Sequence, residues 1–162
     1  MQWSELFRLT ATALREELPA DLRAYHWEPR HGQAKAWFGN PDIHYELWWR
    51  GRLHVLELGL HFESDALTNA RLLAAFHARA KEVRRALGRG ARIEEWDKGW
   101  TRIWEPVSLG LADSELRERV PARFVSYVKT LEPILRDELP NDVRWSVSAR
   151  ARDARRASRS AR

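Results

Sequence analysis

Residues 43–62, IHYELWWRGRLHVLELGLHF, decide the fold of this chain. Apolar side chains recur at every second position through both halves of this stretch, and a period of two is typical of β-strands that bury one face. The apolar face collects Ile43, Tyr45, Leu47, Trp49, Leu56, Leu58, Leu60 and Phe62. Because so apolar a face must be covered, we expect it to form one wall of the core, with helices packed on it.

The dipeptide Arg50-Gly51 divides this stretch and is expected to form a tight turn between strands over 43–49 and 52–62. A two-residue turn would place His44 opposite Glu57. The second face of the hairpin collects His44, Glu46, Trp48, Val55, Glu57, Gly59 and His61. Its polar character predicts a surface that faces solvent.

Helical periodicity and turn residues define the remaining elements. Before and after the hairpin we expect a helix over 4–18 capped by Ser4, an unassigned stretch over 21–32, a strand over 34–38, and one helix from Ser64 or Asp65 to Leu87. There follow a hairpin over 92–104 that ends at Pro106, a helical region that begins at Asp113 or Ser114 and breaks at Pro121, and a short strand or coil over 142–147. The order α-βββ-α-ββ-α predicts one α+β domain over residues 1–148. Its antiparallel sheet would have five strands, a three-stranded meander plus a hairpin, with helices packed on one face.

The composition excludes several classes of protein. Without cysteine there is no disulfide framework, thiolate zinc site, iron–sulfur cluster or cysteine nucleophile. No apolar run approaches the length of about 18 residues that a membrane span needs, and residues 1–5 do not resemble a secretory signal. We therefore expect a cytoplasmic protein without membrane contact. The sequence has neither a glycine-rich phosphate loop nor a GxSxG motif, so we expect no cofactor and no serine nucleophile.

The net charge of +5 lies entirely in the last fourteen residues, 149–162, which hold six arginines and one aspartate. This segment has no large apolar residue, so we expect a disordered basic tail. Arginines attract phosphates, which makes a nucleic acid a candidate partner for Arg150, Arg152, Arg155, Arg156 and Arg159. The alternative is a solvated terminal extension.

The second hairpin carries the densest group of aromatic residues. Alternation, with a three-residue turn, places Glu94, Trp96, Trp100, Arg102 and Trp104 on one of its faces. Ile93 and Ile103 alternate onto the other face and are expected to point into the core. Because indole rings suit interfaces, we predict a partner-binding or dimer surface made of Trp48, Trp96, Trp100, Trp104 and Arg102. Packing of these rings within the protein itself is the alternative.

A polar group on the first hairpin is a second candidate. His44, Glu46, Glu57 and His61 project from the same face. Imidazole and carboxylate groups within reach of one another can ligate a divalent ion or act as an acid–base pair. Alternation alone also collects the polar residues of a half-exposed sheet on one face, so the alternative is a solvated surface with ion pairs across the strands.

The element order is also similar to the restriction-endonuclease-like core. The dipeptide Pro41-Asp42, followed by Glu57 within a strand, resembles the start of the PD…(D/E)xK signature, whose acids would hold a metal ion that activates water. Glu16 or Glu17 of the first helix would complete the acidic set. However, Gly59 stands where that signature has its lysine.

The same order resembles the type III secretion chaperone/YbjN-like fold over residues 4–138. That resemblance implies a helix-flanked antiparallel sheet that forms a homodimer. Together with the tryptophans, it favours a non-enzymatic protein-binding module, homodimeric, with chaperone-like or regulatory duties. Two alternatives stay open: a metal-dependent nuclease-like enzyme that uses Asp42 and Glu57, and a nucleic-acid-associated protein that uses the arginine-rich tail.

Overall fold

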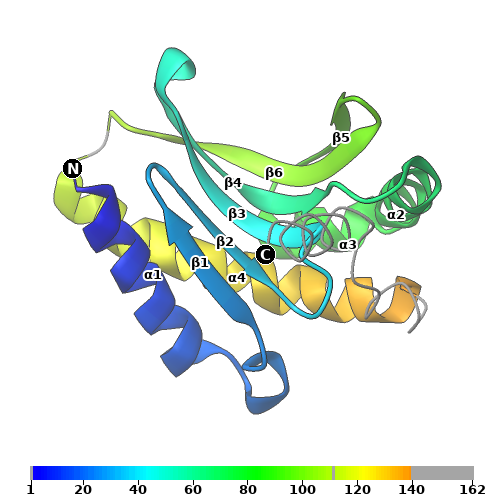
Figure 1. Cartoon of the computed structure of the whole chain (residues 1–162), viewed down its shortest axis with the longest axis horizontal. Coiled ribbons are helices and arrows are strands. Elements are labelled where there is room, and N and C mark those ends of the chain that lie inside the picture. Colours follow the sequence, from blue (N-terminus) through cyan, green and yellow to red (C-terminus); the bar gives the residue numbers. More distant parts are fainter. Residues whose placement is uncertain (1, 111, 140–162) are drawn as a thin grey trace, which may run out of the picture.

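A six-stranded antiparallel sheet with the strand order β1-β2-β3-β4-β6-β5 organises the fold (Figure 1). The structure, a computed structural model, describes residues 2–110 and 112–139. Its strands are β1 (His26–Arg30), β2 (Gln33–Trp37), β3 (Ile43–Arg50), β4 (Val55–Phe62), β5 (Arg92–Asp97) and β6 (Trp100–Ser108). Its α-helices are α1 (Trp3–Glu17), α2 (Ala66–Ala78), α3 (Ala80–Leu87) and α4 (Asp113–Glu138). The predicted α+β class is confirmed, with six strands in place of five.

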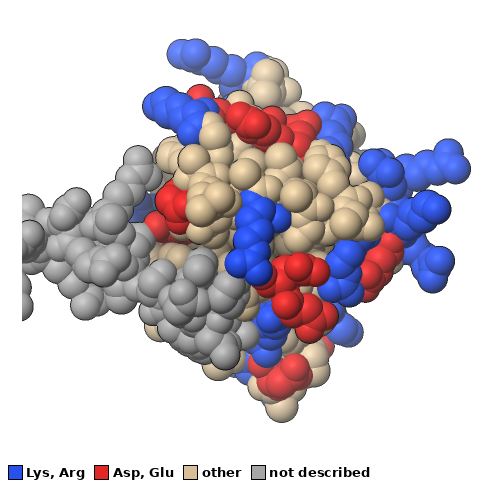
Figure 2. Space-filling model, turned by 90° about the vertical axis from the view of Figure 1, so that its right-hand side faces the viewer, with Lys and Arg blue, Asp and Glu red and all other residues tan. Residues whose placement is uncertain are grey.

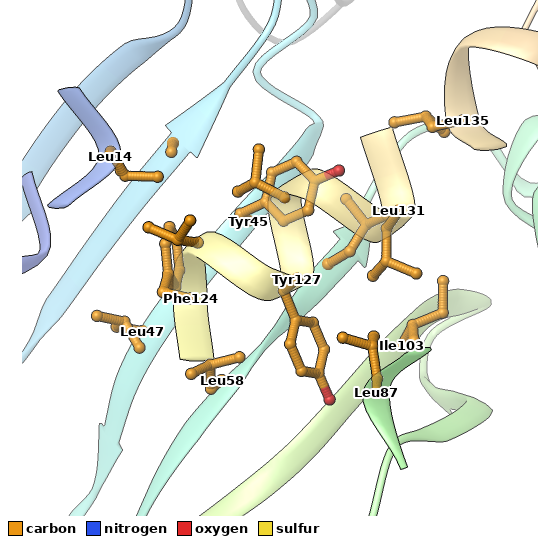
Figure 3. Packing of buried hydrophobic residues seen from close by; sticks show 14 of the residues in the cluster. Leu14, Tyr45, Leu47, Leu58, Leu87, Ile103, Phe124, Tyr127, Leu131 and Leu135 are labelled. Carbon is orange, nitrogen blue, oxygen red and sulfur yellow. The ribbon is translucent and has the colours of Figure 1, made fainter. Parts of the chain in front are cut away.

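The helices pack against the face of the sheet that carries the alternating leucines of β4. Helix α4 runs across this face with α1 beside it, and Figure 3 shows Phe124 and Tyr127 of α4 among the apolar side chains of β3, β4 and β6. At the other end of the sheet, Phe76 of α2 stacks on Phe62 of β4 with ring centroids 5.7 Å apart. The apolar face predicted from residues 43–62 is therefore the sheet's wall of the core.

Strand β1 is the element that the sequence did not predict. It lies at the edge of the sheet and pairs with β2 alone, with Pro29 opposite Ala34. Its sequence, HWEPR, has no apolar alternation, and a proline is tolerated at an edge because a missing N–H costs no ladder bond there. The strand is identified by its pairing, which a local pattern cannot show.

The turn between β3 and β4 is longer than predicted. Residues Gly51–Leu53 form a 3-10 turn and His54 follows in the left-handed region, with φ of 49°. His44 therefore pairs with His61, and the predicted pairing of His44 with Glu57 is wrong by four residues along β4 (61 − 57 = 4). Because four is an even number, every side chain keeps its predicted face although its partner changes.

The helices differ from expectation at their ends and breaks. Helix α1 is preceded by Gln2, whose side chain makes no capping bond, so Ser4 is not its cap. The predicted helix 64–87 is two helices that meet at Arg79, while Asp65 caps α2 as expected by accepting the Thr68 N–H. Helix α4 continues through Pro121, where a break was predicted.

Strand β6 also continues past its predicted end. At Pro106 it pairs only with β4, because β5 begins at Arg92 opposite Trp104, so the missing N–H of the proline can face the unpaired side. A bulge between Glu95 and Asp97 moves the partner of Trp100 from the predicted Trp96 to Asp97. The segments 142–147 and 149–162 lie outside the described residues. None of the helices in the described part combines the length and apolar character that a membrane span requires.

Candidate functional site on the outer face of the sheet

The face of the sheet turned away from the four α-helices of the described part is called here the outer face. Alternation along β2, β3, β4, β5 and β6 places on it Lys35, Trp37, His44, Glu46, Trp48, Arg50, Glu57, His61, Glu94, Trp96, Trp100, Arg102 and Trp104. As predicted, Ile93 and Ile103 point the other way and lie in the core. All the residues predicted to form binding or metal sites on the two hairpins thus share one continuous surface.

The outer face is not the solvated surface that the polar pattern predicted. His44, Glu46 and Glu57 are each 1% exposed and His61 is fully buried. The cover comes from long side chains of the neighbouring strands: the Trp96 ring stands edge-on to His61 at 6.0 Å, and the Arg102 guanidinium lies 4.8 Å over Trp96. Short polar groups next to the sheet are therefore sealed beneath indole rings and guanidinium groups.

Four charged residues in the middle of this face form an arginine cluster: Arg50, Glu57, Glu94 and Arg102. Arg102 donates to Glu57 at 2.5 Å and to Glu94 at 2.7 Å, and Arg50 donates to the second oxygen of Glu57 at 3.1 Å. Burial raises the pKa of Glu57, although the two guanidinium groups oppose this shift. Every charge in the cluster has an opposite partner, so it requires no further ligand.

Three tryptophans along one side of this face form a half-exposed tryptophan group: Trp48, Trp96 and Trp100. The Trp96 ring lies 6.4 Å from Trp48 and 6.0 Å from Trp100. Trp104, predicted to face outward with them, is only 8% exposed, because Arg102 lies 3.9 Å over its ring and its N–H donates to Glu94 at 2.6 Å. Trp104 and Arg102 are thus part of the buried layer, which removes them from the predicted contact surface.

Four residues at the other end of β3 and β4 form a histidine cluster: His44, Glu46, His61 and Glu63. One ligand atom from each residue can be chosen so that all four lie within 4.8 Å of one another. His44 Nε2 is 3.2 Å from Glu46 Oε2 and 4.0 Å from Glu63 Oε1, and His61 Nδ1 is 4.0 Å from Glu46 Oε2. The Lys35 ammonium is 3.7 Å from Glu46 and 3.8 Å from Glu63.

The electrostatics of the histidine cluster depend on burial. Burial alone would raise the pKa of Glu46, but its hydrogen bond with His44 and the electrostatic effect of His61, His44 and Lys35 lower it to about 2. Complete burial lowers the pKa of His61 to about 3, so its imidazole is neutral at pH 7. Within residues 2–110 and 112–139, both ring nitrogens of His61 lack a hydrogen-bond partner. Imidazole nitrogens and carboxylate oxygens gathered this closely are a donor set that a metal ion can use.

The nuclease-like constellation is not assembled. Asp42 lies beside Glu63, whose N–H donates to the Asp42 carbonyl, whereas Glu57 lies six residues further back along β4. At about 3.3 Å per strand residue this separates the two acids by about 20 Å. Glu16 and Glu17 are exposed on α1, on the helical side of the sheet. Asp42 and Glu57 therefore cannot share a metal ion.

Sequence reasoning found three members of the histidine cluster but missed Glu63 and included Glu57 in its place. A usable signal was present: His44-Tyr45-Glu46 and His61-Phe62-Glu63 repeat the same His-x-Glu triplet on adjacent strands. In an antiparallel pair with His44 opposite His61, the two triplets run in opposite directions and their acids approach the histidines from both sides. The predicted register hid this symmetry.

Comparison of the chain with protein-family models, with curated proteins and with solved structures finds no match.

Proposed function

We propose that this chain is a non-enzymatic interaction module with chaperone-like or regulatory duties, and that its outer face pairs with a second copy of the same chain. The observation that carries the proposal is the tryptophan group, three adjacent indoles left half-exposed on the side of the sheet opposite the helices. Each indole buries about 150–250 Å² when covered, which makes such rings the strongest anchors of protein interfaces.

The charges around the tryptophan group favour self-association over capture of a strongly acidic or basic partner. Arg92 is exposed at one margin, and Asp97 is exposed at the other end of the same strand, β5. Figure 2, which views the molecule from the side of α2 and β5, shows basic and acidic side chains interspersed rather than segregated. In a two-fold dimer each patch must complement itself, and a surface with both signs at its rim satisfies that condition.

The fold supports the same proposal. All helices of the described part lie on one face, so two sheets can approach through their outer faces without displacing a helix. The element order predicted from the sequence resembles the type III secretion chaperone/YbjN-like fold, and that resemblance also implies a homodimer. The arginine cluster, already neutralised within each chain, would lie beneath the interface without adding unpaired charge.

Sedimentation of the full chain over a concentration series tests this proposal. We expect dimers that dissociate on dilution, with Trp48→Ser and Trp100→Ser each weakening self-association at least about tenfold, as loss of an interface anchor does. Leu67→Ser is the matched control, because Leu67 is 81% exposed on α2, away from the outer face. A strict monomer at every concentration, or a dimer weakened as much by Leu67→Ser as by Trp48→Ser, would overturn the proposal.

A further inference from the structure

We infer that the histidine cluster is a binding site for a divalent transition-metal ion, with Zn²⁺ as the ion that fits it best. The donors are His44, Glu46, His61 and Glu63, two nitrogens and two oxygens held by β3 and β4. The site adjoins the tryptophan group, because the Trp96 ring lies over His61, but none of its four donors belongs to that group or to the arginine cluster.

The two histidines are oriented as metal-binding histidines are. His44 Nδ1 lies 2.8 Å from the Pro41 carbonyl oxygen and turns Nε2 toward the two carboxylates. His61 Nε2 lies 3.3 Å from Glu57 Oε1 and turns Nδ1 toward Glu46. In metal sites the nitrogen that does not bind the ion faces a carbonyl or a carboxylate, and both rings have this orientation here, which leaves the other nitrogen of each as the ligand.

The cluster contains an unsatisfied polar group of the kind that a ligand explains. His61 is fully buried, and neither of its ring nitrogens has a hydrogen bond to any residue that the structure describes. A buried polar atom without a partner is costly, and it is rare in folded proteins. A metal ion bound to Nδ1 would satisfy one nitrogen and draw the ring into place between Glu46 and Glu57.

The spacing of the donors suits a small ion. A tetrahedral site with bonds of about 2.1 Å holds its ligand atoms about 3.4 Å apart. His44 Nε2 and Glu46 Oε2 already lie 3.2 Å apart, and the widest pair in the cluster needs to contract from 4.8 Å. Side-chain rotations supply movements of this size without any change of the strand pairing.

The Lys35 ammonium lies beside the two carboxylates and would compete with a metal ion for them. Its ammonium bridges Glu46 and Glu63, and its side chain is 25% exposed at the edge of the cluster. A flexible lysine at a solvent boundary can swing outward when a stronger cation enters. The two carboxylates outnumber this single ammonium, so the buried cluster attracts further positive charge.

The ligand set selects among metal ions. Imidazole nitrogen favours zinc and its first-row neighbours over Mg²⁺ and Ca²⁺, which prefer oxygen ligands alone. Four protein donors also complete a tetrahedral sphere, whereas catalytic zinc keeps a position open for water. We therefore assign a structural ion that fastens the outer side of β3 to that of β4.

Calorimetric titration of the metal-stripped full chain tests the inference, with Zn²⁺ and Mg²⁺ as the probes. We expect one equivalent of Zn²⁺ to bind and Mg²⁺ to bind far more weakly. His44→Gln and Glu63→Gln should each lower the Zn²⁺ affinity by about 100-fold or more, exceeding the usual loss for an outer hydrogen-bonding group. His77→Gln is the matched control, because His77 is an exposed histidine on α2.

Glu63→Gln keeps the test decisive if a buried histidine variant fails to fold, because Glu63 lies at the rim with its side chain 17% exposed. Co²⁺ provides a second readout, since its visible absorption reports tetrahedral coordination. Absence of Zn²⁺ and Co²⁺ binding, or binding that survives both His44→Gln and Glu63→Gln, would overturn the inference.

Lys35→Met separates a metal site from a network of ion pairs. If the cluster binds metal, removal of the competing ammonium should tighten Zn²⁺ binding at least about tenfold, one charge being worth roughly a factor of ten at a partly buried site. If the cluster is only an ion-pair network, the variant loses stability without gaining Zn²⁺ affinity. The second result would contradict the inference even if some Zn²⁺ bound.

Discussion

Replacement of Arg102 by methionine should destabilise the fold more than any other single change to the outer face. Methionine keeps the length and the apolar contacts of the side chain but removes its charge and all its donors. The variant therefore leaves Glu57, 1% exposed, with Arg50 as its only guanidinium partner among the described residues. Glu94 loses the same guanidinium and keeps only the Trp104 N–H of these two donors.

The magnitude follows from the burial of the pair. Loss of one partner of a buried ion pair costs about 3–5 kcal/mol, because the other charge stays buried and uncompensated. Arg50 remains 3.1 Å from Glu57, which points to the lower end, about 3 kcal/mol. For a chain of this size each kcal/mol lowers Tm by about 2–4 °C, so the variant should melt about 6–12 °C below the parent.

The penalty should depend on pH in a defined direction. Burial raises the pKa of Glu57 above 4.5 in the folded protein, against the opposing charges of Arg102 and Arg50. The folded state therefore binds a proton more tightly than the unfolded state, and ionisation of Glu57 costs stability as the pH rises through its folded pKa. Without Arg102 that pKa rises further, so the loss in Arg102→Met should be small near pH 4.5 and full at neutral pH.

Urea unfolding at several pH values measures this prediction. Arg92→Met is the matched control, because Arg92 lies 5.1 Å over the same Trp104 ring but is exposed. A double variant with Glu57→Gln should recover most of the lost free energy at neutral pH, since position 57 then carries no buried charge. Equal destabilisation by Arg92→Met, or a loss in Arg102→Met that does not change between pH 4.5 and pH 7.5, would refute the reasoning.

Three further predictions address the sheet, a helix end and the tail. Gly59→Ala should lower the free energy of unfolding, measured in urea, by about 1–3 kcal/mol, because the added Cβ would lie 2.6 Å from the Ile103 carbonyl oxygen. Gly90→Ala is the control and should leave this free energy nearly unchanged, because the atom nearest to its added Cβ is 3.5 Å away. Asp65→Ala should cost about 1 kcal/mol in thermal unfolding through loss of the α2 cap, and Asp65→Asn should retain most of it. Deletion of residues 149–162 takes the net charge from +5 to zero and should abolish retention on DNA at low salt. If the full chain shows no salt-sensitive retention, the nucleic-acid alternative is excluded.

Much of the fold was predictable because alternation is a local property. The faces of β3 and β4, and of Ile93 and Ile103, could be assigned from period two alone, and each assignment agrees with the structure. Elements without such a pattern were missed or misplaced. Strand β1 contains a proline and no alternation, and α4 continues through Pro121 because its packing on the sheet offsets the local cost of that residue.

The candidate site was only partly predictable, since it depends on register. The extra residues in the turn after Arg50 shift β4 and place His61 rather than Glu57 opposite His44. That shift places the two His-x-Glu triplets side by side, and Glu57 instead forms ion pairs with Arg50 and Arg102. No residue within either strand specifies the length of the turn, so the identity of the cluster could not follow from the strands alone.

Local chemistry thus settles which side chains share a face of each strand, because a side chain's direction depends only on its position along the backbone. How deeply those side chains are buried does not follow from their position along the strand. Glu46 and His61 look like surface residues in their own strands, yet both are buried, and the ring over His61 is Trp96 of β5, a distant segment of the chain. Burial of a polar layer, and with it a place for a cation, arises from contacts between distant segments and is decided when the sheet assembles.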